Sequence, residues 1–551
     1  MEYLAGDLRQ MRRTPLHDEH VEAIRRAGTI VRFGKGEMVA RVGEPANRFV
    51  YLLEGEVEVV HPFTGERHLP TSLGPTQFAG DIAFLGGGNH TLGLRAAADT
   101  RAIVVPREDM LELMSRIPEM SDIIITVYAA RRRRQLEDQD SSLTLIGADV
   151  DKNVRRLEIF AARNRIPFMS MDVGSPEAVE ALQLAGLPGD KPAVIFGADN
   201  VIEDPTPAKV AKTLGMDLSL CEQDVVDLLI VGGGPSGVAA GVYAGAEGLR
   251  ALVVDETAIG GQAGTSSRIE NYMGFPTGIS GADLVWRGEV QAMKFGTRFV
   301  VPRRVERLVQ LSNGVFRAVL DDGLEVLARS VLVATGVQYR RLPLARLEAF
   351  EGAGVYYAAT ESEARFCRNT DVVVIGGGNS AGQAAMYLSR TANHVHVLVR
   401  GKSLAKSMSD YLLSRLEADP KISIHYQTEV TGLHGAEHLE KLMVADKASG
   451  EEREVDSRAL FVMVGAAPNT DWIADLVALD EKGFVLTGQA AGRESAYATS
   501  CPGIYAVGDV RATSVKRVAS SVGEGSVVIS DVWSYLNPQP QQDPVPAIGD
   551  G

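Results

Sequence analysis

The sequence contains very little cysteine. Only Cys221, Cys367 and Cys501 occur in 551 residues, and no two of them are close enough to form a Cys-x-x-Cys pair. A disulfide framework is therefore not expected, and the default location is a reducing cytoplasm. Disulfide exchange within the chain is not expected either, because a second thiol must resolve the mixed disulfide.

Long apolar runs and an excess of positive charge are also missing. No run approaches the roughly 18 apolar residues that span a bilayer, and the N-terminus MEYLAGDLRQMRR does not read as a signal peptide. A net charge of −15 argues against nucleic acid as a partner. The four arginines at 131–134 are the local exception, and we interpret them as a solvated helix face or linker.

The length and composition predict a multidomain α/β protein. A chain of 551 residues with 45% hydrophobic and 23% charged residues should fold into several globular domains. No metal-ligating cluster is assigned, and no membrane association is expected.

Residues 1–137 are predicted to form a β-roll followed by helices. Short β-rich runs at 49–53, 56–60 and 102–105 alternate with glycine-marked turns, and a helical pattern covers 107–137. The stretch RVGEPANRFVYLLEGEVEVV resembles the cyclic nucleotide-binding domain family.

In that family a short helix, a Glu and an Arg hold the ribose and the cyclic phosphate. The corresponding stretch FAGDIAFLGGGNHTLGLRA has Asp81 in place of the Glu and His90 near the place of the Arg, while Arg95 comes too late. Without a bidentate cation the phosphate loses its strongest contact. We therefore expect that cyclic nucleotide is not bound in the usual way.

Residues 141–218 show the order β-α-β-α-β-β-α. The expected strands include 143–146, 168–172 and 193–196, and the expected helices are 154–164, 177–185 and 207–214. This order resembles the thioredoxin and glutaredoxin family. The family's Cys-x-x-Cys would follow the first strand, where this sequence reads GADVDKN. A scaffold or docking role is therefore expected.

The segment DLLIVGGGPSGVAAGVYAGAEGLRALVVDE carries the strongest motif. Gly232 permits the tight turn after a strand at 228–231, Gly234 lets a pyrophosphate approach the backbone, and Gly237 lets helix and strand pack closely. The helix N-terminus then faces the phosphates. Asp255 ends the next strand, at 251–254, where it can accept from ribose hydroxyls.

Later motifs resemble the low-molecular-weight thioredoxin reductase family, from about residue 225 to 535. They are GGQ at 260–262, IENYMGFP, ATG at 334–336 and GIYAVGDVRATSVKRVASSVGEG. The resemblance implies a bound FAD. Together with the first glycine motif, it assigns to FAD the residues Gly232, Gly234, Pro235, Ser236, Gly237, Asp255, Gly261, Gln262, Asn271, Thr335, Gly336, Gly508, Asp509, Lys516, Arg517 and Val518.

A second glycine motif begins at Asp371 in DVVVIGGGNSAGQAAMYLSRTANHVHVLVRGKS. Arg400 stands where Asp255 stood in the first unit, and a cation there suits the 2′-phosphate of NADP. NADPH is favoured over NADH on this argument, although simple solvation of a strand end remains the alternative reading of Arg400. The residues assigned to NADPH are Gly376, Gly378, Asn379, Ser380, Ala381, Arg400 and Lys402.

The two motifs imply a discontinuous layout. A FAD-binding domain is expected at 225–337 and 466–535, with a NAD(P)H-binding domain inserted at 338–465 and a disordered tail at 536–551. In relatives the inserted domain rotates to bring nicotinamide to the flavin, so hinges are expected near 337 and 466.

The redox-active dithiol of the thioredoxin reductase family is absent. Its Cys-Ala-Thr-Cys-Asp aligns with Ala358-Ala359-Thr360-Glu361-Ser362, which contains no thiol. Cys367 lies six residues after Glu361. It is either a lone redox thiol or a small buried hydrophobe, and the second reading is favoured.

The sequence therefore predicts a FAD-dependent NAD(P)H oxidoreductase that resembles thioredoxin reductase and passes electrons to an unidentified acceptor, a small molecule or a protein. The alternative is a flavin-based sensor with little turnover, whose N-terminal domains bind a ligand or a partner. A homodimer is expected from the resemblance alone.

Overall fold

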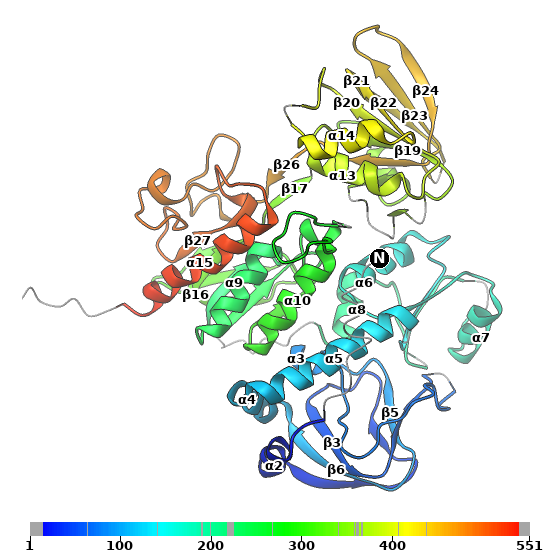
Figure 1. The fold of residues 1–551 in the computed structure, drawn as a ribbon, viewed down its shortest axis with the longest axis vertical. Helices are drawn as coiled ribbons and strands as arrows, with labels where there is room; N and C mark the ends of the chain where they lie inside the picture. The colour runs from blue at the N-terminus through cyan, green and yellow to red at the C-terminus, as the bar shows by residue number, and fades with distance from the viewer. Residues whose placement is uncertain are drawn as a thin grey trace, which may run out of the picture.

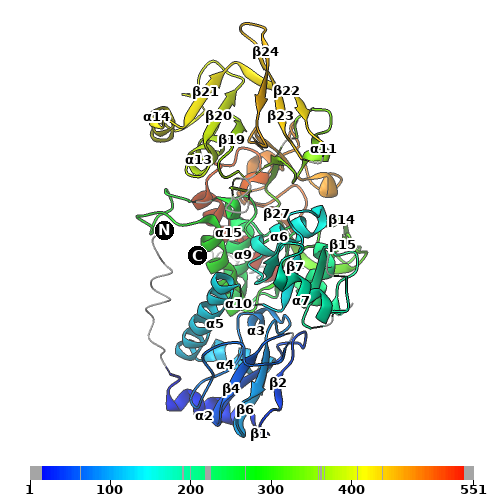
Figure 2. The same cartoon turned by 90° about the vertical axis from the view of Figure 1, so that its right-hand side faces the viewer.

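The computed structural model describes residues 15–538, apart from residues 63, 140, 189–190, 199, 217–224, 267, 340, 358, 360–362, 365–366, 406 and 437. Figure 1 shows four bodies along the long axis, from the blue N-terminal domain to the yellow domain at the opposite end. The orange and red segment that follows the yellow domain returns to pack beside the green one. The turned view in Figure 2 shows the same order. The predicted tail from residue 539 onward lies outside the described residues.

Two three-stranded antiparallel sheets, ordered β1-β6-β3 and β2-β5-β4, form the N-terminal domain. Phe33, Val39, Leu52, Leu94 and Ala102, from both sheets, share one buried core. The elements are α2 (Asp18–Ala27), β1 (Thr29–Phe33), β2 (Met38–Ala40), β3 (Arg48–Glu54), β4 (Val57–Val60), α3 (Ala83–Gly86), β5 (Gly93–Ala96), β6 (Thr100–Pro106), α4 (Arg107–Arg116) and α5 (Pro118–Asp138).

The helical pattern predicted at 107–137 is confirmed, and it is divided at Ile117 into the two helices α4 and α5. Pro118 has no N–H to donate, which is tolerated in a first helical turn and not in an interior. A new helix therefore begins at Pro118.

The interpretation of the arginine run as solvated is wrong for its first two members. Arg131 donates to the carbonyl oxygens of Phe78 and Gly80, at 2.8 and 2.6 Å. Arg132 is only 8% exposed and lies 2.9 Å from the carboxylate of Asp81. The other two arginines pair with acids one turn later on α5. Arg131 and Arg132 thus fix the position of the loop before α3.

The middle domain is a four-stranded mixed sheet with the order β10-β9-β7-β8, in which only β7 and β8 are parallel neighbours. Helices α6 and α8 cover one face and α7 covers the other. The predicted element order is confirmed, with boundaries shifted by at most two residues. The elements are β7 (Leu143–Ile146), α6 (Lys152–Arg163), β8 (Met169–Met171), α7 (Pro176–Leu184), β9 (Ala193–Phe196), β10 (Asn200–Val201) and α8 (Pro207–Thr213).

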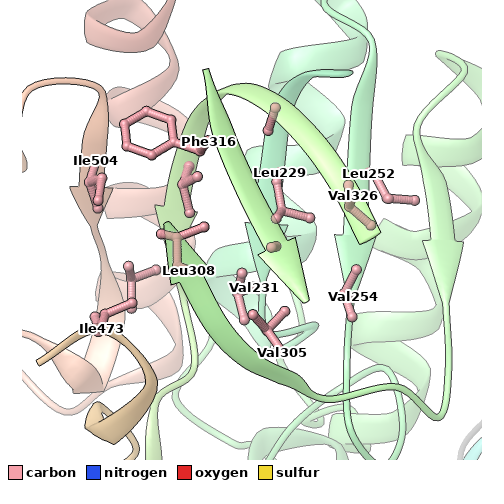
Figure 3. Packing of buried hydrophobic residues seen from close by; sticks show 14 of the residues in the cluster. Leu229, Val231, Leu252, Val254, Val305, Leu308, Phe316, Val326, Ile473 and Ile504 are labelled. Carbon is pink, nitrogen blue, oxygen red and sulfur yellow. The ribbon is translucent and has the colours of Figure 1, made fainter. Parts of the chain in front are cut away.

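The first Rossmann-type domain is a seven-stranded sheet with the order β13-β12-β11-β16-β15-β14, and β27 also pairs with β16. Strands β11, β12, β13, β16 and β27 are mutually parallel, and α9 and α15 cover one face. Figure 3 shows the other face, where Leu229, Val231, Phe316 and Ile504 pack together. The elements are β11 (Val225–Val231), α9 (Pro235–Ala246), β12 (Ala251–Val254), η1 (Ala263–Thr265), α10 (Gly281–Lys294), β13 (Arg298–Val300), β14 (Val305–Gln310), β15 (Phe316–Leu320), β16 (Glu325–Val333), η2 (Asp471–Ile473), η3 (Gly488–Ala491), β27 (Ile504–Ala506), η4 (Gly508–Val510) and α15 (Val518–Leu536).

The second Rossmann-type domain has a parallel sheet with the order β18-β25-β19-β20-β21. Helices α13 and α14 cover one face, and the sheet β22-β23-β24 contributes to the core on the other. The short antiparallel pair β17 and β26 lies where the chain passes between the two domains. The elements are β17 (Val337–Tyr339), α11 (Leu347–Phe350), β18 (Val355–Tyr356), β19 (Asp371–Ile375), α13 (Asn379–Leu388), β20 (His394–Val399), α14 (Asp410–Ala418), β21 (Ile422–Tyr426), β22 (Thr428–His434), β23 (Lys441–Asp446), β24 (Glu452–Asp456), β25 (Ala459–Val462) and β26 (Ala466–Pro468). Among the described residues, no helix is long and apolar enough to cross a membrane.

Helix α10 joins the first Rossmann-type domain to the N-terminal domain. Val290 belongs to the same buried cluster as Phe49, Phe84 and Tyr128, and Met293 packs against that cluster. Figure 1 shows α10 directly beside α5 and α3. The two domains therefore share one apolar core and do not merely touch.

Glu289 is a partly buried carboxyl on this helix. Burial raises the pKa of Glu289 to about 7, although Arg165 and Arg132 act in the opposite direction. The folded protein therefore holds this proton more tightly than the unfolded chain does. Protonated Glu289 therefore stabilises the folded protein at low pH. This contribution is lost as the pH rises from about 4.5 to about 7.

We expect Glu289→Gln to raise the midpoint of thermal unfolding at pH 8 by roughly 2–6 °C, because glutamine removes the cost of a buried charge. The gain should shrink at pH 5, where the folded carboxyl is already protonated. Thermal melts at both pH values test this, with the exposed Glu247→Gln as the control. An equal shift at both pH values would contradict it.

Candidate functional site

The first glycine turn has the geometry of a phosphate-binding turn. Gly232 has a φ of 109°, and a Cβ added there would lie 2.3 Å from the carbonyl oxygen of Ala334. A Cβ at Gly237 would lie 1.9 Å from the carbonyl oxygen of Gly232, whereas a Cβ at Gly234 would meet nothing within 4 Å. Gly232 and Gly237 thus pack the turn, and Gly234 leaves space open for a ligand. Helix α9 begins at Pro235 without a side-chain cap, so its first N–H groups are available to an anion.

Asp255 braces this turn. Its carboxylate accepts from the backbone N–H groups of Gly233, Thr257 and Ala258, at 2.8, 2.9 and 2.9 Å. A carboxylate has about four acceptor positions, so three are used within the protein. Asp255 thus holds Gly233 in the turn, and its contact to ribose stays a prediction.

The loop 260–262 lies on the same turn. Gly260 donates to the carbonyl oxygen of Gly233 at 2.7 Å, and a Cβ at Gly261 would lie 3.1 Å from the Cα of Gly234. The side chain of Gln262 donates to the carbonyl oxygen of Val337 at the domain crossing. The structure therefore brings this loop, the glycine turn and the crossing together.

Three further predicted residues, Thr335, Gly336 and Asn271, differ in their exposure and hydrogen bonding. The hydroxyl of Thr335 donates to the carbonyl oxygen of Asn469 at 3.1 Å, and Gly336 has a φ of 60°. Asn271 is exposed, on a loop where Met273 is 93% exposed. The structure does not bring Asn271 into a hydrogen bond with any described residue.

Gly508 and Asp509 lie against helix α9. A Cβ at Gly508 would lie 2.7 Å from the hydroxyl of Ser236, and Gly508 donates to Glu524 at 2.6 Å. Burial raises the pKa of Asp509, Lys516 lowers it and Glu524 raises it. Asp509 has no hydrogen bond or ion pair with any described residue, so its carboxylate remains available to ligand hydroxyls.

Glu524 was missed by the sequence reasoning. It also binds Arg511 at 2.8 Å, and both side chains are more than four-fifths buried. Glu524 therefore fixes the turn that carries Asp509. The glutamate in the motif GEG at 523–525 was the available signal.

Lys516, Arg517 and Val518 lie at the start of α15. Lys516 and Arg517 are exposed, and the ammonium of Lys516 lies 5.3 Å from the ring centre of Phe484. Val518 is the first residue of the helix.

The second glycine turn repeats the geometry of the first. Gly376 has a φ of 149°, and a Cβ there would lie 2.3 Å from the carbonyl oxygen of Met463. Helix α13 begins at Asn379 after Gly378, without a side-chain cap, and Ala381 is fully buried. Its N–H groups are thus available to a second anion.

The polar residues predicted around this turn are mostly open to solvent. Asn379 accepts from the backbone N–H of Ser409 at 2.8 Å, and Ser380 is exposed. Arg400 and Lys402 are exposed directly after β20. The two cations therefore stand at the edge of the second turn, where the sequence placed them.

The favoured reading of Cys367 as a small buried hydrophobe is confirmed, and the alternative reading as a redox thiol is wrong. Cys367 is fully buried and donates to the carbonyl oxygen of Glu363 at 3.2 Å. Burial, and then Glu363, raise the pKa of its thiol to about 12. Since the thiolate is the nucleophile, this thiol is inert at neutral pH. Cys501 is also buried with a raised pKa, and Cys221 lies outside the described residues.

We expect Cys367→Ser to leave the rate of NADPH oxidation within about twofold of wild type, because a neutral buried thiol takes no part in electron transfer. Steady-state assays compare the variant with Cys501→Ser. A loss of more than about tenfold in kcat, with the fold intact, would restore the redox role.

The segment that aligns with the family dithiol is only partly described. Residues 358 and 360–362 lie outside the described residues, while Ala359 is buried. The hydroxyl of Tyr357 donates to Glu351 at 2.7 Å, and burial raises its pKa.

In the N-terminal domain the residues near the expected nucleotide pocket are already paired. Asp81 accepts from Ala83 N–H at 2.9 Å and binds Arg132. Arg95 lies 2.6 Å from Glu58, its neighbour on β4. Burial lowers the pKa of His90, which disfavours its charged form. These pairings leave neither Arg95 nor His90 as a ready phosphate cation.

Comparison with known families agrees with this geometry. Residues 226–525 match the family described as pyridine nucleotide-disulphide oxidoreductase. The chain belongs to this family. Its members of the thioredoxin-reductase type are FAD- and NAD(P)-dependent oxidoreductases. Residues 30–117 also match the cyclic nucleotide-binding domain.

Thioredoxin reductases are among the relatives of this chain. That of Streptomyces clavuligerus is 33% identical over 332 residues, which are 59% of this chain and 99% of the relative. That of Mycolicibacterium smegmatis is 33% identical over 319 residues, 58% of this chain and 98% of the relative. Among solved structures, thioredoxin reductase from Lactococcus lactis aligns with a TM-score of 0.52 and 26% identity, covering 56% of this chain and 99% of its own.

Proposed function

We propose that this protein is a FAD-dependent NADPH oxidoreductase with a thioredoxin-reductase-like core and an external electron acceptor. The observation that carries the proposal is the pair of glycine turns, each with a blocked glycine, an open glycine and an uncapped helix N-terminus. When bound, FAD would supply the redox chemistry, by accepting a hydride from a nicotinamide and passing electrons on.

The described residues fit FAD at the first turn. The first N–H groups of α9 face the place of the pyrophosphate, and the open side of Gly234 admits it. The carboxylate of Asp509 can accept from ribityl hydroxyls, and Glu524 and Arg511 hold the turn that carries it. The second turn, with Arg400 and Lys402 at its edge, fits NADPH.

The electron acceptor is proposed to lie outside the chain. The sequence has three cysteines and no pair, and the two described cysteines are buried with raised pKa values. Reduction of thioredoxin through an internal dithiol is therefore not proposed. A quinone, oxygen, a ferredoxin-like carrier or a partner's disulfide are the candidate acceptors.

The N-terminal half is proposed to support or regulate this core. The strand order β10-β9-β7-β8 agrees with a thioredoxin-like middle domain without thiols, which suits a scaffold or docking role. The pairing of Arg95 with Glu58 supports the proposal that cyclic nucleotide is not bound in the usual way. A cytoplasmic homodimer is proposed by analogy.

A flavin-based sensor with little turnover is the second candidate. The observation that favours it is the apolar core shared by α10 and the N-terminal domain, which could link ligand binding in one domain to the other.

Anaerobic reduction followed by an acceptor screen tests both candidates. We expect FAD-loaded protein to lose its yellow colour with NADPH and to regain it rapidly with one class of acceptor. Reduction without turnover by any acceptor would favour the sensor, and protein that does not take up FAD would refute both.

We expect Arg400→Ala to raise the KM for NADPH by roughly 10-fold while changing the KM for NADH by less than about twofold, because a guanidinium binds a phosphate strongly. Steady-state kinetics with both nucleotides measure this, with Arg390→Ala, on the same domain, as the control. Equal effects on both nucleotides would remove the argument for the 2′-phosphate.

A further inference from the structure

Arg165 of the middle domain contacts the first Rossmann-type domain directly. Its guanidinium forms an ion pair with Asp283 of α10 and lies 5.2 Å from the ring centre of Trp286, one turn further along the same helix. The Arg165 and Asp283 side chains are 20% and 31% exposed, so the pair is largely shielded from water. A guanidinium stacks well on an aromatic face, and its planar fork suits a shielded pairing with a carboxylate.

The N-terminal domain fixes the backbone at Arg165. Arg132 of α5 donates to the carbonyl oxygen of Arg165 at 3.4 Å while binding Asp81 at 2.9 Å. Arg165 itself has a φ of 51°, a conformation that a residue other than glycine adopts only when its surroundings fix it. Asn164 adds a hydrogen bond to the carbonyl oxygen of Thr257, in the loop after β12, at 3.1 Å.

Arg165 binds the N-terminal end of α10. The same end supports the loop at 260–262, which is assigned to FAD. Asp283 is the third residue of the helix, and its backbone N–H donates to the hydroxyl of the N-cap residue Ser280 at 3.0 Å. A Cβ added at Gly281 would lie 1.6 Å from the carbonyl oxygen of Ala263, and Gly281 donates to Ser266 at 2.8 Å. The first turn of α10 therefore rests directly on η1.

The η1 turn continues from Gln262 without a break. The hydroxyl of Thr265 donates to the carbonyl oxygen of Gln262 at 2.8 Å. Gly260 and Gly261, just before, contact Gly233 and Gly234 of the phosphate turn. A shift in the first turn of α10 must therefore move the loop that carries Gln262, because close-packed neighbours leave no room for independent motion.

We propose that Arg165 is a positioning residue for the flavin site, supplied by the middle domain. It acts through Asp283 and the first turn of α10 to hold the loop at 260–262 in its place. The inference rests on the proposed function, since it assumes that this loop lies against FAD. It also gives the thiol-free domain a task in the flavoenzyme that requires no redox chemistry of its own.

The test measures FAD binding and the flavin spectrum in full-length apoprotein reloaded with FAD. We expect Arg165→Ala and Asp283→Asn each to weaken FAD binding by roughly 3- to 30-fold, the range for coupling through packed networks, and to change the shape of the flavin absorption band near 450 nm. The double variant should lose no more FAD affinity than either single variant, because both changes break the same contact. Arg165→Lys should recover part of the affinity.

The control is Arg156→Ala, which removes an exposed arginine from α6 of the same domain and should leave both properties unchanged. If Arg165→Ala lowers thermal stability but leaves the FAD affinity and the spectrum as in wild type, the residue is only structural and the inference is overturned. If Arg165→Ala does not fold, Asp283→Asn and Arg165→Lys decide by the same two readouts. Wild-type protein that fails to bind FAD would instead refute the proposed function.

Discussion

Replacing Gly237 by alanine is expected to yield protein that does not retain FAD. The new Cβ would lie 1.9 Å from the carbonyl oxygen of Gly232 and 3.3 Å from the side chain of Ile230. A backbone atom cannot move aside as a flexible side chain can, so α9 must shift away from the turn. The N–H groups at the start of α9 then no longer point at the pyrophosphate, and the affinity for FAD should fall by about 100-fold or more.

Gly234→Ala is the matched comparison. A Cβ there meets no protein atom within 4 Å, so the apoprotein should melt at the wild-type temperature, while FAD binding is weakened because the methyl group occupies the space of the ligand. Gly237→Ala should instead lower the melting temperature of the apoprotein itself. Absorbance at 450 nm after gel filtration, with melts of both apoproteins, measures these effects. A fully yellow Gly237→Ala protein would contradict the assignment of the first turn to FAD.

Gly376→Ala is expected to separate the two nucleotide sites. Its φ of 149° is unfavourable for alanine, and the Cβ would lie 2.3 Å from the carbonyl oxygen of Met463. The second turn should distort while the first, in another domain, stays intact. We therefore expect protein that keeps FAD but is reduced by NADPH at least about 100-fold more slowly, while dithionite still reduces it.

Stopped-flow absorbance at 450 nm measures this rate. Gly401→Ala is the control, because a Cβ there lies 3.6 Å or more from its neighbours at an ordinary φ. Normal reduction of Gly376→Ala by NADPH would show that the second turn does not bind the nicotinamide nucleotide. Loss of FAD from the same variant would show that the two domains are not independent.

These two predictions use glycines that the sequence had already singled out, and the structure adds the reason for each. Gly232, Gly237 and Gly376 are glycine because protein backbone stands where a Cβ would be, whereas Gly234 is open. Within the motif, a glycine required by packing and a glycine that leaves room for a ligand look identical as residues. The motif assigned these roles by position, and the structure shows which atoms fill the space beside the packing glycines and that the space beside Gly234 is open.

Other sequence-based expectations failed where distant segments meet. The arginines at 131 and 132 look solvated in sequence, yet they bind a loop some 50 residues earlier. Cys367, by contrast, is buried as its favoured reading expected, and this burial decides against the redox alternative.

The sequence alone determined the two dinucleotide units, their order and the absence of a dithiol. A glycine turn between a buried strand and a helix is a local arrangement, and residues near in sequence specify it completely. The tertiary structure alone decided the pairing of Arg165 with Asp283, of Arg132 with Asp81 and of Glu524 with Gly508. A hydrophobic or charged pattern states that a face must be covered or a charge paired. It does not state which of many distant partners does so, because that choice depends on how whole domains pack.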